Sequence, residues 1–120
     1  LIAQQEEQHA EWVKSLLVSR GVKAEVLNKT ERYWEETVKQ ITDWDTGWAV
    51  AAHAEAMRLE RIEAICADEN ADADIKEVFG KILVEERFHE KAFRSFTTDE
   101  AMEKTLAGHM AGLNELGLTA

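Results

Sequence analysis

The sequence is poor in residues that interrupt helices or form cross-links. It contains no proline, six glycines and one cysteine, Cys66. A single cysteine excludes an intrachain disulfide, a CxxC pair and a four-cysteine zinc or rubredoxin-type iron site within this chain, and it suits a reducing cytoplasm. Strong helix formers, above all Ala, Glu, Leu, Lys and Arg, are abundant. The composition therefore predicts an all-α protein.

Long apolar runs are also missing. No stretch approaches the roughly 18 uninterrupted apolar residues of a membrane span, and the opening LIAQQEEQHAEW lacks the order of a signal peptide. We therefore expect no membrane association, and a single helical domain over residues 1–120. Because residue 1 is Leu and no capping residue precedes the first helix, we also expect this bundle to be incomplete at its N-terminus.

Basic residues are outnumbered by acidic ones. The chain carries 14 Lys and Arg against 24 Asp and Glu, a formal net charge of −10. Such a charge repels phosphate backbones and anionic lipid surfaces. Nucleic acid is therefore not an expected partner, and the acidity by itself is typical of solvated helix faces.

Apolar residues recur at the helical period in five segments separated by short polar breaks. Gly21 is placed to end the first helix, and Thr97 with Glu100 matches a capping box that would open the last one. The second segment carries Tyr33, Trp34 and Val38 on its apolar side and would form a long helical crossover between the first and third helices. The five predicted helices span residues 1–20, 23–43, 46–67, 72–96 and 97–117.

Two of these helices place a carboxylate and an imidazole inside an apolar stripe. The spacing of three residues puts Glu6 and His9 on one face of the first helix, and Glu86 and His89 on one face of the fourth. The first stripe is Ile2, Glu6, His9, Val13, Leu16 and Arg20, and the fourth-helix stripe is Ile75, Phe79, Ile82, Glu86, His89, Phe93 and Phe96. Two Glu-x-x-His motifs are therefore predicted to face a core.

A buried carboxylate without a partner costs several kcal/mol, so such a core needs a cation, a hydrogen-bond network or proton uptake. Glu and His on consecutive turns can converge on one metal ion, while the second carboxylate oxygen reaches another. Hard oxygen donors with one imidazole per ion suit iron or manganese. The alternative is a metal-free buried polar network of three Glu and two His.

The third helix adds one further inward carboxylate, Glu55. It sits near the middle of the apolar stripe, whereas Glu60 and Glu63 fall off it. The separation of 31 positions from Glu55 to Glu86 allows half a helix, a tight turn and half a helix back. Both carboxylates would then reach the same level of a bundle. The full stripe is Trp48, Ala52, Glu55, Leu59, Ile62 and Cys66.

These motifs resemble the ferritin-like di-iron carboxylate superfamily, in which the ligands follow the order Glu, Glu-x-x-His, Glu, Glu-x-x-His. The resemblance covers nearly the whole chain, with rubrerythrin-like and hydroxylase-like branches as the possible relatives. It implies a ferritin-like helical bundle that binds two iron ions, two manganese ions or a mixed pair. The metal ligands that it implies are Glu6, His9, Glu55, Glu86 and His89.

The chain departs from this pattern because no helix precedes Glu6, so the first-helix carboxylate has no counterpart. An upstream helix, a second subunit of a homodimer, or an internal residue would have to supply it. Glu31 is the best internal candidate, since it shares a predicted stripe with Leu27, Trp34, Val38 and Ile41.

The other histidines and the tryptophans carry less information. His53 falls off the third-helix stripe, which predicts a surface or second-sphere position, and His109 is expected to be a partly buried structural residue. The tryptophans are expected to pack in the core or at an interface, although they could also shape a substrate pocket. They are Trp12, Trp34, Trp44 and Trp48.

The resemblance implies an oxidoreductase that activates dioxygen or peroxide. A rubrerythrin-like protein would reduce peroxide or oxidise ferrous iron, and a hydroxylase-like one would insert oxygen into an organic substrate. Because no CxxC pair is present, electrons would come from a separate donor protein. The competing hypothesis is a metal-storing or purely structural bundle without catalysis, and the sequence does not identify a substrate.

Overall fold

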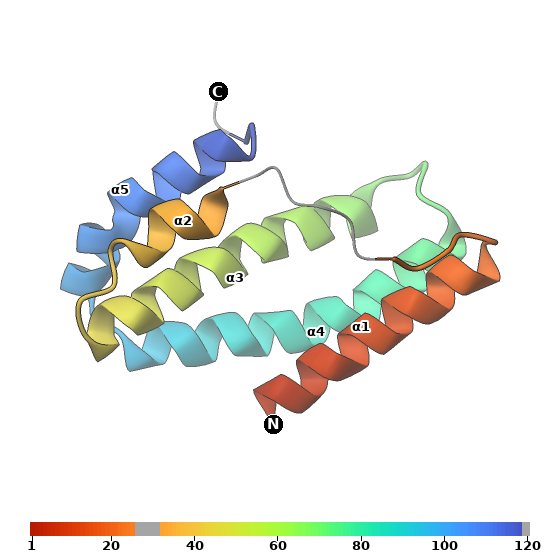
Figure 1. Cartoon of the computed structure of the whole chain (residues 1–120). Helices are drawn as coiled ribbons and strands as arrows, with labels where there is room; N and C mark the ends of the chain where they lie inside the picture. The colour runs from red at the N-terminus through yellow and green to blue at the C-terminus, as the bar shows by residue number, and fades with distance from the viewer. Residues whose placement is uncertain (26–31, 119–120) are drawn as a thin grey trace. The chain divides into compact units, whose positions relative to one another are not determined.

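The computed structural model describes residues 1–25 and 32–118, and in these residues it contains five α-helices and no strand (Figure 1). The predicted all-α class is confirmed. None of the described helices combines the length and apolar character that a membrane span requires. The helices are α1 (Ile2–Ser19), α2 (Tyr33–Val38), α3 (Trp44–Ala67), α4 (Ala73–Phe96) and α5 (Asp99–Glu115).

Helix ends are set by local hydrogen bonds. Gly21 has a φ of 73° and ends α1 as predicted, because this left-handed conformation lets the Val22 amide donate to the Leu17 carbonyl at 2.9 Å. At the start of α3, the Asp43 carboxylate accepts from the Thr46 amide at 2.8 Å, and the Thr46 hydroxyl accepts from the Asp43 amide at 3.0 Å. This reciprocal cap stops any helix from running through Asp43.

The start of α5 differs from the prediction. Thr98, not Thr97, is the capping residue, and its side chain accepts a hydrogen bond from the amide of Ala101. Thr97 instead donates its hydroxyl to the carbonyl of Asp45 at 2.6 Å. The predicted capping box between Thr97 and Glu100 was therefore wrong by one residue, because a contact distant in sequence occupies the Thr97 hydroxyl.

The long helical crossover predicted over residues 23–43 was also wrong. Residues 22–25 are not helical, and α2 covers only Tyr33–Val38. Of its predicted apolar side, Tyr33 is buried as expected, whereas Trp34, Val38 and Ile41 are exposed, and Thr37 is buried instead. The remaining members of the predicted stripe, Leu27 and Glu31, lie outside the described residues.

The chain divides into two compact units, and α3 and α4 each contribute to both. The first unit comprises Leu1–Leu27 and Arg58–His89, and the second comprises Asn28–Met57 and Glu90–Ala120. Apolar residues of α1, α3 and α4 form the core of the first unit. Its buried members are Ile62, Ile82 and Leu83, with Trp12, Val13, Leu59, Cys66, Val78 and Phe79 packed against them.

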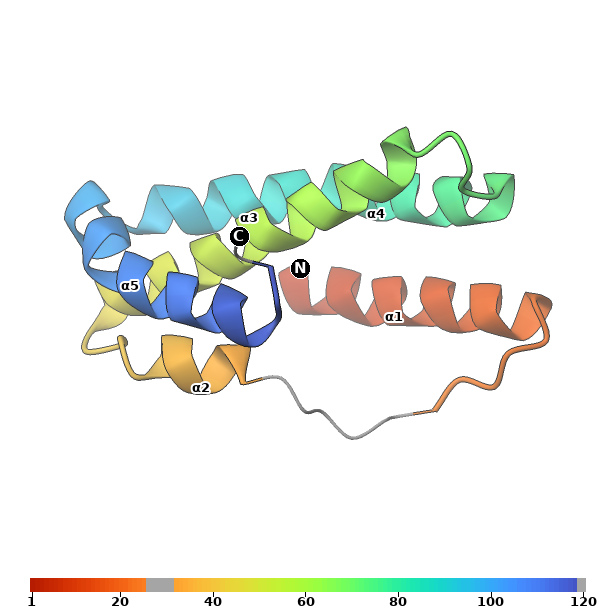
Figure 2. The same cartoon turned by 90° about the horizontal axis from the view of Figure 1, so that it is seen from above.

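In the second unit α2 lies alongside α5 (Figure 2). Two glycines of α5, Gly108 and Gly112, face α2. A Cβ atom at Gly112 would lie only 2.9 Å from Cε2 of Tyr33, and one at Gly108 only 3.1 Å from the carbonyl oxygen of Glu36. These glycines therefore permit a close approach of the two helices, which explains why Tyr33 and Thr37 form the buried face of α2.

A histidine network crosses the same unit. The rings of His53 and His109 stack with centroids 4.7 Å apart, and Nδ1 of His109 lies 2.7 Å from the hydroxyl of Tyr33. Nε2 of His53 contacts the Met102 carbonyl and the Thr105 hydroxyl, each at 3.1 Å. The predicted surface position of His53 was wrong, because the side chain is buried against α5, whereas the alternative of a second-sphere position stays a prediction. His109 is partly buried, as predicted.

The close approach of α2 and α5 predicts that two Gly→Ala substitutions change stability in opposite directions. Gly112→Ala is expected to destabilise the protein by about 1–3 kcal/mol, because the new methyl group overlaps the Tyr33 ring. Gly80→Ala in α4 is the matched control. It meets nothing within 4 Å and is expected to stabilise the protein by about 0.5–1 kcal/mol. Urea denaturation measures both changes, and a stabilising Gly112→Ala would contradict the described packing.

The histidine network generates a prediction about pH. Burial lowers the pKa of His53 and of His109 below the ordinary value of 6.5, and the nearby His53 ring lowers the pKa of His109 further. The unfolded chain therefore binds more protons as the pH falls through about 6.5. Stability contributed by the two neutral rings is present above that pH and is lost below it.

We expect the melting temperature to fall between about pH 7.5 and pH 5.5. The double variant His53→Gln/His109→Asn keeps polar groups near the bonded ring nitrogens but cannot titrate, so its melting temperature should depend less on pH. Calorimetry across this range provides the comparison. An equally steep pH dependence in the variant would show that other groups cause it.

Candidate metal centre

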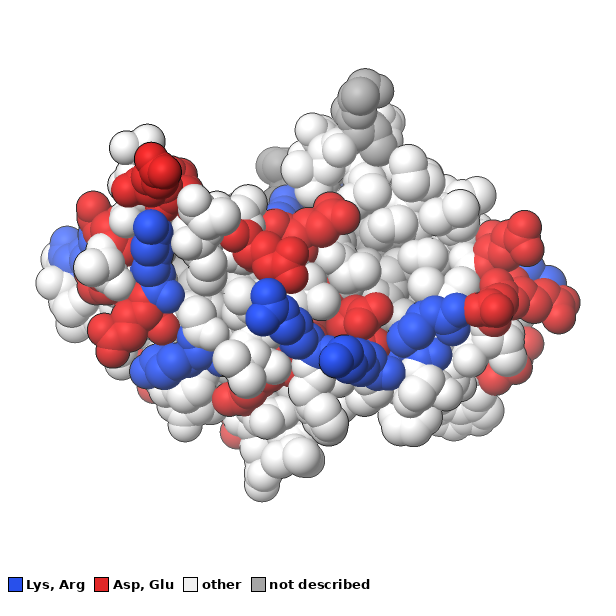
Figure 3. All heavy atoms as spheres, turned by 180° about the vertical axis from the view of Figure 1, so that it is seen from behind, with Lys and Arg blue, Asp and Glu red and all other residues white. Residues whose placement is uncertain are grey.

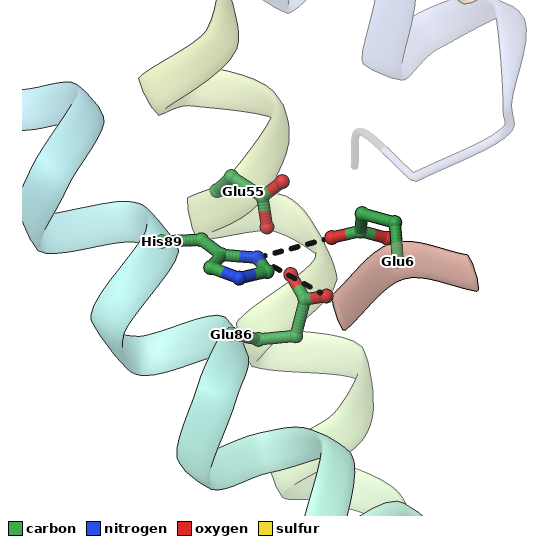
Figure 4. A group of neighbouring side chains, drawn as sticks. All are labelled: Glu6, Glu55, Glu86 and His89. Carbon is green, nitrogen blue, oxygen red and sulfur yellow. Dashed lines mark ion pairs between the residues drawn. The ribbon is translucent and has the colours of Figure 1, made fainter. Parts of the chain in front are cut away.

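Four predicted ligands lie together in the first unit. Glu6 and His9 come from α1, and Glu86 and His89 come from α4. Nδ1 of His89 lies 3.0 Å from Oε1 of Glu6 and 3.7 Å from Oε1 of Glu86 (Figure 4). Nδ1 of His9 lies 3.1 Å from Oε1 of Glu86 and 3.9 Å from Oε2 of Glu6. Both imidazoles thus direct Nδ1 at the same two carboxylates.

The four side chains meet because each pair occupies one face of its helix. Residues three apart in a helix are separated by about 300° of rotation and therefore lie only about 60° from each other, so both members of a pair point the same way. The α4 pair follows Ile82 and Leu83 of the first-unit core, and the α1 pair precedes Val13, which packs on that core. The hydrophobic stripes therefore bring the polar pairs to the same level.

Burial of this group is deep. His9, Glu86 and His89 expose 6%, 2% and 0% of their surface. Glu6 is more accessible, with 43% of its side chain exposed, although its Oε1 atom is buried. Charged or strongly polar groups at this depth require a cation, a proton or hydrogen-bond partners to offset the loss of hydration.

The ring nitrogens discriminate among these possibilities. Nε2 of His89 donates a hydrogen bond to Oε1 of Gln5 at 2.7 Å, so in the neutral ring Nδ1 carries a lone pair. That lone pair faces the oxygen of Glu6, an acceptor opposite an acceptor. Among the described residues no hydrogen bond reaches Nδ1 of His89 or either ring nitrogen of His9. A cation between these donors would relieve the repulsion, as would a proton between the nitrogen and the oxygen.

The donor set fits a pair of iron or manganese ions. Carboxylate oxygens and neutral imidazole nitrogens are their preferred protein ligands, and two histidines with shared carboxylates provide one nitrogen for each ion. In the first unit, Glu6, Glu86 and His89 each offer one ligand atom, and these three atoms lie within 4.8 Å of one another (Figure 4). The described geometry therefore allows metal binding, while the ligand assignment itself stays a prediction.

Glu55 requires separate treatment. It is buried on α3, with 4% of its surface exposed, and it belongs to the second unit. Glu60 and Glu63 of the same helix are exposed, so the predicted distinction between inward and outward carboxylates of α3 is confirmed. Glu31, the internal candidate for a further ligand, lies outside the described residues. His53 and His109 belong to the hydrogen-bonded network of the second unit.

The tryptophans divide into packed and exposed residues. Trp12 contacts the first-unit core and lies 5.6 Å from the His9 ring, and Trp48 stacks on Phe93. These two agree with the expected packing role. Trp34 and Trp44 are exposed, at 42% and 81%, so these two do not pack in the core, and the alternative of packing at an interface stays a prediction.

Two residues near the centre were missed by the sequence analysis, Gln5 and Glu85. Gln5 contacts His89, and Oε2 of Glu85 lies 3.4 Å from Nε2 of His9. Each directly precedes the glutamate of a Glu-x-x-His motif and therefore lies about 100° away from the apolar stripe. Both residues stand one position before a motif glutamate, so the motifs themselves indicated these positions, although the residues lie outside the apolar stripes.

Comparison with known proteins gives one informative result. No curated protein and no solved structure matches the chain. The Rubrerythrin family, however, matches residues 1–97, a segment that contains both Glu-x-x-His motifs and Glu55. Together with the all-α fold and the buried Glu and His side chains, this match supports a di-iron carboxylate protein. The chain therefore belongs to the Rubrerythrin family.

Proposed function

We propose that the protein is an oxidoreductase that uses a pair of iron or manganese ions to reduce peroxide or dioxygen. The observation that carries this proposal is the pair of buried histidines, His9 and His89, whose Nδ1 atoms face the shared carboxylates of Glu6 and Glu86. Membership of the Rubrerythrin family agrees with it. Among possible activities we favour peroxide reduction or ferrous iron oxidation over oxygen insertion into an organic substrate, because the chain matches the Rubrerythrin family.

The ligands in this proposal are Glu6, His9, Glu55, Glu86 and His89. The metal pair, when bound, supplies the electrons that reduce the oxygen substrate, since each ion can change its oxidation state by one. The three carboxylates among these ligands lie on three different helices, α1, α3 and α4.

The chain's own contribution is orientation and exclusion of water. Gln5 fixes the ring orientation of His89 through its 2.7 Å hydrogen bond, and the depth of His89 and Glu86 keeps bulk water from the donors. Glu6 is the accessible member of the group, with 43% of its side chain exposed. A small oxygen substrate would therefore enter on the Glu6 side.

Further partners are part of this proposal. Electrons would come from a separate donor protein, and a homodimer would supply the additional carboxylate that an upstream helix could alternatively provide. On the face shown in Figure 3, acidic side chains lie beside the Lys and Arg side chains. A nucleic-acid partner is not proposed. Light scattering would test the dimer directly, since a strictly monomeric protein would contradict it.

The first test of the function is metal content. Protein purified after iron-supplemented growth is expected to hold two iron ions per complete site, measured by elemental analysis. Glu86→Ala should lose most of this metal, because it removes a buried carboxylate that both histidines face. Glu63→Ala is the control, since Glu63 is exposed and pairs with Arg87 at 3.5 Å. Absence of metal from the unaltered protein would overturn the proposal.

The second test is reactivity. The ferrous protein, mixed without other reductant with peroxide or with dioxygen, should be oxidised in a stopped-flow experiment while its iron content stays at two per site. A storage protein would instead accumulate much more iron than it has ligands. A metal-bound protein that reacts with neither oxidant would favour the structural bundle.

Metal should also stabilise the fold. Without it the carboxylates of Glu6 and Glu86 share a buried space, and an ion that binds only the folded state raises stability by mass action. At a free-metal concentration about 100 times the dissociation constant, the expected gain is about 2.7 kcal/mol. Calorimetry of metal-free and metal-loaded protein provides the comparison. Equal melting temperatures would favour a metal-free polar network.

A further inference from the structure

The residues directly before the two motif glutamates form a crossed arrangement around the histidines. Gln5, before Glu6 on α1, contacts His89 of α4, and Glu85, before Glu86 on α4, contacts His9 of α1. In both cases the contact is to Nε2, on the ring edge opposite the Nδ1 that faces the shared carboxylates. Each helix thus supports the histidine supplied by the other.

The two supports differ in charge. Oε1 of Gln5 is a neutral amide acceptor 2.7 Å from Nε2 of His89, whereas Oε2 of Glu85 belongs to a carboxylate 3.4 Å from Nε2 of His9. The Oε2 atom of Glu85 is buried, and no hydrogen bond from a described residue reaches it. Its charge is therefore directed at His9 and is only partly screened by water, since 24% of the side chain is exposed.

We propose that Glu85 and Gln5 are positioning residues that make the two metal positions unequal, with the ion bound by His9 held more tightly than the ion bound by His89. This inference rests on the proposed metal pair. A carboxylate behind an imidazole raises the basicity of the ring and strengthens its donation to a metal, whereas a neutral amide orients the ring with less effect on its basicity. The difference in charge between Glu85 and Gln5 therefore makes the affinities of the two metal positions differ.

The burial of the histidines makes this difference effective. His9 and His89 expose 6% and 0% of their surface, so neither ring can turn freely to solvent. In this environment the charge of a group in contact with the ring is weakly screened. The second partner of each histidine therefore sets its ring orientation and its donor strength.

The test is an anaerobic titration of the metal-free protein with ferrous iron, followed by Mössbauer spectroscopy of the iron-57 form. The unaltered protein should bind two ions in two steps and show two distinct quadrupole doublets. Glu85→Gln, which keeps the shape of the side chain and removes its charge, should weaken the tighter step about 10–100-fold and shift one doublet. The second step should change little.

The charge can also be moved to the other histidine. Gln5→Glu should tighten the weaker step, and the double variant Gln5→Glu/Glu85→Gln should bring the two affinities to the opposite order. Gln5→Glu also keeps the proposal testable if Glu85→Gln does not fold. Glu77→Gln is the matched control, because Glu77 is an exposed residue of the same helix as Glu85. It should change neither step nor the spectrum.

The outcomes separate this inference from the proposed function. An unaltered protein that binds no iron would overturn the proposed function and this inference with it. An unaltered protein that binds two ions while Glu85→Gln leaves both steps and both doublets unchanged would overturn this inference alone. The same holds if Glu85→Gln weakens both steps equally, because Glu85 would then act on the fold or on both ions.

Discussion

The burial of carboxylates beside imidazoles is the constraint on which the first unit depends. Glu86 and His89 lie in the interior of a helical core, where unpaired charge costs several kcal/mol. The hydrophobic stripes of α1 and α4 hold them there, because Ile82, Leu83 and Val13 must pack next to them. The apolar core thus provides the energy that keeps an otherwise unfavourable polar group in place. In the proposed function, a cation bound there would offset the charge and would couple stability to metal binding.

The same arrangement explains why the side chains are precisely oriented as well as close. A histidine held by a metal needs a second contact that selects its ring orientation. Gln5 provides this contact for His89 from the neighbouring helix, and Glu85 faces His9 in the corresponding way. Helix packing therefore positions each histidine from two directions, and a change in the spacing of α1 and α4 would alter both the histidines and their supports.

The second unit depends on a different physical device, the close approach of α2 and α5. Gly108 and Gly112 leave space where larger residues would stand, and the ring of Tyr33 occupies part of it. His53, His109 and the Tyr33 hydroxyl then complete a buried polar network. Because burial lowers the pKa of both histidines, this packing favours neutral rings, and it gives the unit a stability that depends on pH.

The sequence by itself determined the helical class, most helix bounds and the inward faces of α1, α3 and α4. Their apolar residues recur at the helical period, and this local pattern already places Glu6 with His9 and Glu86 with His89. It also distinguished the buried Glu55 from the exposed Glu63. The resemblance to the ferritin-like superfamily rested on the same spacing, and the Rubrerythrin match over residues 1–97 confirmed it.

Only the tertiary structure decided the features that depend on contacts distant in sequence. The buried face of α2 is Tyr33 and Thr37 because the glycines of α5 admit them, which periodicity within α2 could not show. His53 is buried for a similar reason, because α5 covers it. The contact of Glu85 with His9 joins residues of two helices. A one-dimensional pattern records which face a residue occupies, whereas its partner depends on how the helices pack.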